Sequence, residues 1–168
     1  MKLILPMLLL ASLLMTACQN PDKTKAQPAS ETEVAAGYDS LLALKLGADQ
    51  WGMSQYVIAF LKAGPNRPAH PDSAARLQKA HMENISRMAS EGKLLLAGPF
   101  LDGGELRGIY LFDVKTIEEA RTLTETDPAV QTGSLIMELH PWYGSAALRE
   151  VNAIHNRISQ PVPATSNQ

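Results

Sequence analysis

The sequence predicts an α+β domain whose strands and helices follow the order β-α-β-β-α-β. Strand-length apolar stretches end at Gly or Gly-Pro, and two longer segments repeat apolar residues every three or four positions, as helices do. A third observation is the Gly-rich turn "LDGGEL" (101–106) between two adjacent apolar stretches. This order is the ferredoxin-like arrangement, to which the sequence adds one helix at each end.

Residues 1–17 have the pattern of a secretory signal. One positive charge at Lys2 precedes an apolar run from Leu3 to Leu14, and the small residues "TA" precede Cys18. About 20 apolar residues are needed to span a bilayer, so the alternative of a permanent transmembrane helix is weak. The segment resembles a bacterial lipoprotein signal. This resemblance implies that Cys18 carries a lipid anchor and that the protein is located in the cell envelope.

Residues 18–37 are predicted to be the lipidated cysteine and a flexible tether, because "QNPDKTKAQPASETEVAAG" contains no aromatic residue. Residues 159–168 are predicted to be a disordered tail for the same reason. Since Gln19 rather than Asp follows Cys18, the lipoprotein resemblance implies the outer membrane, facing the periplasm. Cys18 is the only cysteine, so no intramolecular disulfide is expected, and the lack of a basic stripe argues against nucleic acid as a partner.

An N-terminal extension, 38–54, is expected to contain a short helix over "YDSLLALKLG" (38–47). The first strand follows over "QYVIAFLKAG" (55–64) and ends at Gly-Pro. Prolines in the next loop keep the backbone out of a helix until about Ser73. The central domain is predicted to span 55–143.

The first long helix places a histidine among apolar residues. Leu77, His81, Ile85 and Met88 recur at helical spacing, with charged residues on the opposite side, so His81 is predicted to point inward. Gly92 has the position of a helix C-cap. The strands "KLLLAG" and "RGIYLFDV" (107–114) are then predicted to pair antiparallel.

A second helix is predicted to open with the capping box of Thr116 and Glu119. Asp127 is predicted to be the N-cap of one more short turn, with a proline at the first helical position. The last strand is "SLIMELHPW", and a C-terminal helix is predicted within 144–158. That helix is expected to cover an edge of the sheet or to pack against the N-terminal helix.

Both faces of the predicted sheet are apolar. Tyr56, Ile58 and Phe60 alternate with other apolar residues, whereas a sheet with one wet face alternates apolar and polar side chains. Helices in this topology cover one face of the sheet only. The other apolar face would be exposed to water unless another element or another chain packs on it. A homodimer that packs sheet against sheet, a dimeric α/β barrel, is one solution. A terminal helix that covers the face within one chain is the alternative.

The segment 55–143 resembles the YCII-related (YciI-like) family of small ferredoxin-like proteins that form dimeric barrels. The residues that carry the resemblance are His81 eleven positions before Gly92, "GKLLLAGPF", the pair Asp127-Pro128 and the late "LHPW". The resemblance implies a pocket between helix and sheet in which His81 and Asp127 are catalytic. It also implies that some members are enzymes, one related activity being removal of chloride from a hydroxylated aromatic.

Each candidate residue also has a structural interpretation. His81 is either an acid or base with a carboxylate partner or a buried structural histidine, and the N-cap role alone would explain Asp127. Gly98, Pro99 and Phe100 are predicted to open a ligand pocket or merely to end the strand. His140 and Trp142 are predicted to bind ligand or to form core or dimer contacts. No metal ligand spacing, phosphate loop or nucleophile motif is present, so neither metal nor cofactor is expected.

Two functions follow from these observations. The first is a membrane-anchored enzyme that uses His-mediated proton transfer on a small compound, of which an aromatic is one candidate. The alternative is a non-catalytic ligand-binding or structural lipoprotein of the envelope.

Overall fold

The computed structural model describes residues 37–160. The predicted signal, Cys18, most of the tether and most of the C-terminal tail lie outside these residues. The elements, in chain order, are α1 (Ser40–Lys45), β1 (Met53–Ala63), α2 (Pro71–Ser90), β2 (Leu94–Pro99), β3 (Leu106–Phe112), α3 (Ile117–Thr124), α4 (Pro128–Gln131), β4 (Leu135–Ser145), the 3-10 helix η1 (Ala146–Glu150) and α5 (Val151–Ile158).

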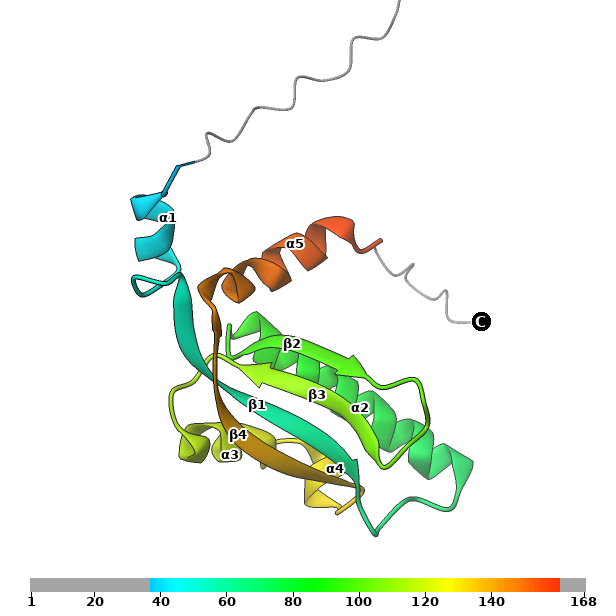
Figure 1. The fold of residues 1–168 in the computed structure, drawn as a ribbon. Coiled ribbons are helices and arrows are strands. Elements are labelled where there is room, and N and C mark those ends of the chain that lie inside the picture. Colours follow the sequence, from blue (N-terminus) through cyan, green and yellow to red (C-terminus); the bar gives the residue numbers. More distant parts are fainter. Residues whose placement is uncertain (1–36, 161–168) are drawn as a thin grey trace, which may run out of the picture. The chain divides into compact units, whose positions relative to one another are not determined.

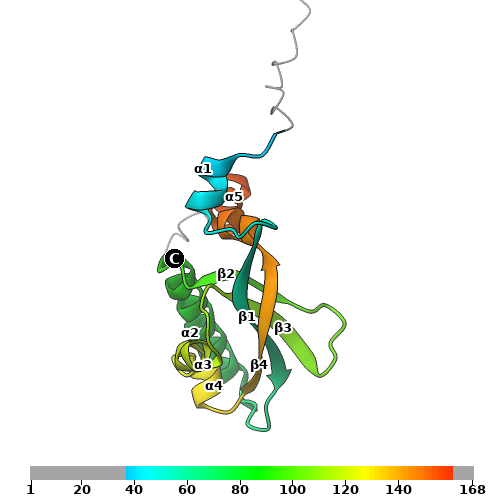
Figure 2. The same cartoon turned by 60° about the vertical axis from the view of Figure 1, so that its left-hand side comes forward.

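The strands form one sheet in the order β2-β3-β1-β4, in which all neighbouring strands are antiparallel. The predicted fold class, α+β with ferredoxin-like order, is therefore confirmed for the chain. Helices α2, α3 and α4 lie on one face of the sheet (Figures 1 and 2). At one end of the sheet lie α1 and α5.

The main core lies between the sheet and these three helices. Val57, Ala59 and Leu61 alternate along β1 toward this face and are buried with Met88 of α2 and Ala120 of α3. Successive side chains of a strand point to opposite faces, so the same alternation sends Tyr56, Ile58 and Phe60 to the other side. The period of two in β1 thus fixes which of its residues the helices bury.

The second face of the sheet is covered at one end only. Leu148 of η1 packs against Tyr56, Leu95 and Leu111, which are buried. Farther along the face, Phe60 is half-buried and Ile136 is 49% exposed. The C-terminal segment therefore covers part of this face, as one of the two alternatives requires, and leaves the remainder open within one chain.

The boundaries of α2 and β4 differ from those predicted. Helix α2 starts at Pro71 rather than near Ser73, because a proline at the first helical position loses no intrahelical hydrogen bond. Strand β4 continues to Ser145, where it pairs with Met53 of β1. After Ser145 the chain forms η1 followed by α5, two short helices within the range 144–158.

Candidate active site

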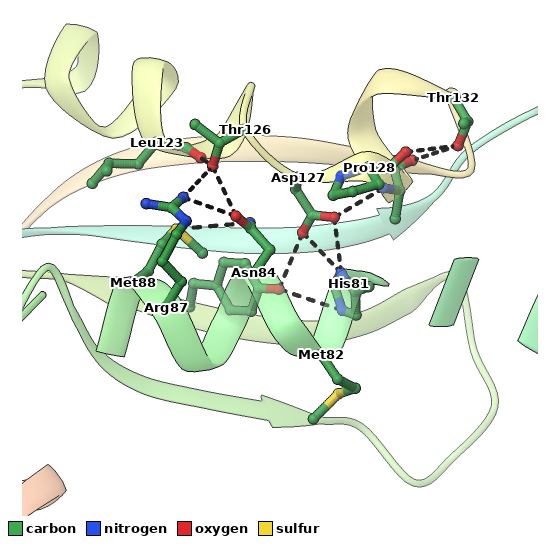
Figure 3. A network of polar contacts seen from close by, with 12 residues as sticks. His81, Met82, Asn84, Arg87, Met88, Leu123, Thr126, Asp127, Pro128 and Thr132 are labelled. Carbon is green, nitrogen blue, oxygen red and sulfur yellow. Dashed lines mark hydrogen bonds and ion pairs between the residues drawn. The ribbon is translucent and has the colours of Figure 1, made fainter. Parts of the chain in front are cut away.

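His81 on α2 and Asp127 before α4 form a buried pair. Nδ1 of His81 lies 2.8 Å from Oδ2 and 3.0 Å from Oδ1 of Asp127 (Figure 3). The exposed fraction is 0% for Asp127 and 9% for His81. An ionised carboxylate only accepts hydrogen bonds, so Nδ1 carries a proton and Nε2 is the atom left to gain or lose one.

The local sequence explains how the two side chains meet. His81 lies in the inward stripe of α2, between the half-buried Leu77 and Ile85. Asp127 is the N-cap of α4, and its Oδ1 accepts the backbone N–H of Ala129 at 2.9 Å. The predicted N-cap is thus confirmed. The same carboxylate therefore both caps α4 and accepts from His81, and the N-cap role does not exclude a role at the site.

Tyr110 of β3 completes the buried group. Its hydroxyl lies 3.4 Å from Oδ2 of Asp127 and 3.4 Å from Nε2 of His81, and its ring is stacked on the imidazole at an angle of 21°. Burial raises the pKa of Tyr110 well above its usual range, and the negative charge of Asp127 raises it further. The phenol remains protonated and serves as a donor. The hydroxyl has a single proton, which it donates to Oδ2 of Asp127, so Nε2 of His81 is left available to a ligand.

A second polar network fixes the turn that carries Asp127. Nη2 of Arg87 donates to Oδ1 of Asn84 at 2.8 Å and to Oγ1 of Thr126 at 2.9 Å. Nη1 of the same guanidinium lies 2.9 Å from both carboxylate oxygens of Glu91. Figure 3 shows Arg87 and Asn84 reaching from α2 to Thr126, the residue before Asp127. This network links α2 directly to the N-terminus of α4.

A pocket with a volume of about 340 Å³ opens beside His81. Its wall comes from the loop before α2, from the N-terminal half of α2, and from the junction of α4 and β4. The lining residues are Arg67, Pro68, Ala74, Ala75, Leu77, Gln78, His81, Ala129, Ser134 and Leu135. The volume is at the small end of the range of about 300–1,000 Å³ for ligand sites. The arrangement thus places an imidazole, oriented by a buried carboxylate, at the wall of a mainly apolar cavity.

Residues 58–143 match the family model of the YCII-related domain. The chain belongs to this family. The uncharacterized protein YjpA of Bacillus subtilis (strain 168) is 32% identical over 62 residues, which are 37% of this chain and 71% of that protein. A solved structure with some similarity is 5-chloro-2-hydroxyhydroquinone dehydrochlorinase (TftG) from Burkholderia phenoliruptrix AC1100 in complex with 2,5-dihydroxybenzoquinone. It has a TM-score of 0.40 and 18% identity, over 53% of this chain and 93% of that chain.

In this YCII-related domain, Gly98, Pro99 and Phe100 do not line the pocket beside His81. They lie at and just after the end of β2. The strand order explains the difference: β2 is at one edge of the sheet, whereas the pocket is lined by Leu135 of β4, at the other edge. The pocket beside His81 therefore lies away from the turn 97–100, and ligand binding by Gly98, Pro99 and Phe100 stays a prediction.

His140 and Trp142 also lie away from His81. Both are on β4, opposite Ile58 and Tyr56, on the face of the sheet that the helices do not cover. Nε2 of His140 lies 2.8 Å from Oε1 of Glu138. Trp142 helps to line a separate hollow of about 170 Å³. The structure thus brings together His81 and Asp127 but neither of these two residues.

Sequence reasoning did not identify Tyr110, Arg67, Gln78 or Ser134 as parts of the site. Tyr110 reads as one more apolar position of β3, and only its place opposite α2 brings its hydroxyl to Asp127. The hydroxyl of Tyr110 could have indicated a polar partner, because buried tyrosine hydroxyls usually have a hydrogen-bond partner. Within residues 37–160, no helix is long and apolar enough to cross a membrane, and no three His, Cys, Asp or Glu side chains cluster to hold a metal ion.

Proposed function

We propose that this YCII-related protein binds a small compound beside His81 and that His81 transfers a proton to or from it. The observation that carries the proposal is the contact of Nδ1 of His81 with both oxygens of the buried Asp127, at the wall of a pocket. A carboxylate that holds one imidazole nitrogen fixes the ring orientation and stabilises the imidazolium that forms when the other nitrogen accepts a proton.

The chemistry follows from the state of each group. Neutral His81 accepts a proton from a C–H or O–H group of the bound compound at Nε2, and the bonding electron pair stays on the compound. Asp127 balances the charge of the resulting imidazolium. The proton then returns either to another atom of the compound or to a group that leaves with its own electron pair. Tyr110 remains protonated throughout and supplies a neutral donor to Asp127.

In this proposal a lipid on Cys18 anchors the protein to the outer membrane. The protein faces the periplasm. The support is the sequence pattern of residues 1–18. Replacement of Cys18 by Ala is expected to leave unprocessed precursor or to release the protein from the membrane fraction. Normal processing and membrane retention of this variant would contradict the lipid anchor.

The proposed assembly is a homodimer through the open part of the sheet. Supporting it are the half-buried Ile58, Phe60 and Ile109 and the exposed Ile136, which a second copy would remove from water. The charged pair of Lys62 and Glu138 lies beside these residues. In a two-fold dimer, both copies contribute the same surface to the interface. A surface that carries one positive and one negative side chain can pack against a copy of itself without bringing only like charges together.

The experiment first seeks a ligand among hydroxylated aromatics and small carboxylates by thermal shift, then measures its conversion. His81→Asn keeps the approximate size of the side chain but does not exchange a proton near neutral pH. We expect it to lower the rate about 10²- to 10⁴-fold. The control is His155→Asn, on the exposed surface of α5. A folded His81→Asn protein with unchanged turnover would contradict proton transfer, and a compound that binds without conversion would favour the non-catalytic alternative.

A further inference from the structure

Arg67 is the one side chain with a permanent charge among those that line the pocket beside His81. The other polar side chains of the wall are Gln78, Ser134 and His81 itself, and no carboxylate is among the lining residues. Asp127 is buried behind the imidazole, where its charge is shared with His81 and the N–H of Ala129. The charge distribution of the wall therefore favours an anion over a cation.

Within residues 37–160, the guanidinium of Arg67 has no partner. No residue in this part of the chain accepts a hydrogen bond from it, and none forms an ion pair with it. By contrast, Arg87 is held by Glu91, and Arg149 by Asp113. The exposed Arg67 thus retains the planar set of donors that matches a carboxylate.

The backbone beside Arg67 is fixed. Gly64 donates its N–H to the carbonyl of Ser134 at 2.9 Å, and Asn66 donates to that of Gly133 at 3.1 Å. The two segments are so close that a Cβ at Gly64 would lie 2.1 Å from the carbonyl oxygen of Gly133. Prolines on either side of the Asn66-Arg67 pair restrict it further. These contacts fix the backbone that carries Arg67 beside the pocket.

We infer that the ligand of this pocket is a small, single-ring carboxylate whose anionic group binds Arg67 while its reacting atom faces His81. This inference rests on the proposed function, because it names the substrate class of the same site. The volume of about 340 Å³ suits one ring with its substituents. The apolar side chains of Leu77 and Leu135 provide walls for the ring. Arg67 also stabilises the negative charge that grows on the compound as His81 removes a proton.

The test compares 4-hydroxybenzoate with the uncharged 4-hydroxybenzamide, which has nearly the same shape. Binding to the full-length chain is measured by calorimetry. Wild type is expected to prefer the carboxylate. Arg67→Gln is expected to weaken binding of 4-hydroxybenzoate about tenfold and to leave binding of the amide unchanged, whereas Arg67→Lys retains most of the preference. Arg76→Gln makes the same change of net charge outside the pocket and is expected to have no effect.

Equal binding of the two compounds to wild type, no binding of either, or equal effects of Arg67→Gln and Arg76→Gln would overturn the inference. If Arg67→Gln does not fold, the side-chain Nε–H resonance of Arg67 is followed in wild type instead. It is expected to shift when 4-hydroxybenzoate is added, and a resonance that does not move contradicts the contact. His81→Asn is expected to abolish turnover but to keep the preference for 4-hydroxybenzoate over the amide, so carboxylate selectivity and proton transfer are tested separately.

Discussion

Asp127 places both carboxylate oxygens within 3.0 Å of Nδ1 of His81, although 46 positions separate the two residues in the chain. The same carboxylate caps α4 through the N–H of Ala129. Two explanations of its presence, a helix cap and a partner for the imidazole, therefore apply to one side chain, and a single substitution separates them.

Asp127→Asn is expected to keep the cap and lose the charge. Asn is about as good an N-cap as Asp, whereas Ala is not, so Asp127→Ala should be less stable than Asp127→Asn by about 0.5–2 kcal/mol. Turnover should fall at least about tenfold in both variants, because neither stabilises the imidazolium. Denaturant unfolding and rate measurements on the two variants check this. Wild-type turnover in Asp127→Asn would reduce Asp127 to its structural role.

Tyr110→Phe is expected to make stability less sensitive to high pH. Burial, and then the charge of Asp127, raise the pKa of Tyr110 in the folded protein. The unfolded chain loses the proton of this tyrosine at about pH 10. The contribution of Tyr110 to the free energy of unfolding is therefore fully present below that pH and is lost as the pH rises above it. Because the pKa of Tyr56 is also raised, the stability of Tyr110→Phe still falls to some extent at high pH.

The measurement is the free energy of unfolding of both proteins near neutral pH and above about pH 10. Near neutral pH, Tyr110→Phe should cost about 1 kcal/mol for the lost hydrogen bond to Asp127. If wild type and variant lose the same stability on going to alkaline pH, the hydroxyl of Tyr110 is not buried as described.

The fold was predictable because its signals are local. The alternation in β1, the stripe of His81 on α2 and the capping box of Thr116 each depend on residues a few positions apart. The pocket was not predictable in the same way. Its wall joins the loop at Arg67 to the junction at Ser134, and the backbone hydrogen bonds between these segments leave no periodic signal in the sequence.

Ile136→Glu is expected to convert the proposed homodimer to a monomer, because it introduces a charge on the open face of the sheet. Met82→Glu on α2 is the matched control: Met82 is 48% exposed and Ile136 is 49% exposed, but the two residues lie on opposite sides of the sheet. Sedimentation at micromolar concentration gives the mass. A wild-type monomer would exclude the dimer, and a dimer that persists in Ile136→Glu would place the interface elsewhere.

Gly64→Ala is expected to damage the pocket, because the new Cβ would lie 2.1 Å from the carbonyl oxygen of Gly133. The loop must then move away from Gly133 and Ser134, and Arg67 moves with it. We expect a loss of about 1–3 kcal/mol in stability and weaker binding of any compound that occupies the pocket.

Gly98→Ala on β2 is the control for Gly64→Ala, since a Cβ added at Gly98 would meet no atom of a non-adjacent residue within 4 Å. It should change stability by no more than about 0.5 kcal/mol and leave binding as in wild type. Thermal unfolding and ligand titration of both variants decide between the two sites. If Gly98→Ala weakened binding and Gly64→Ala did not, the ligand would lie at the end of β2, where the sequence pattern places it, and not between Arg67 and His81.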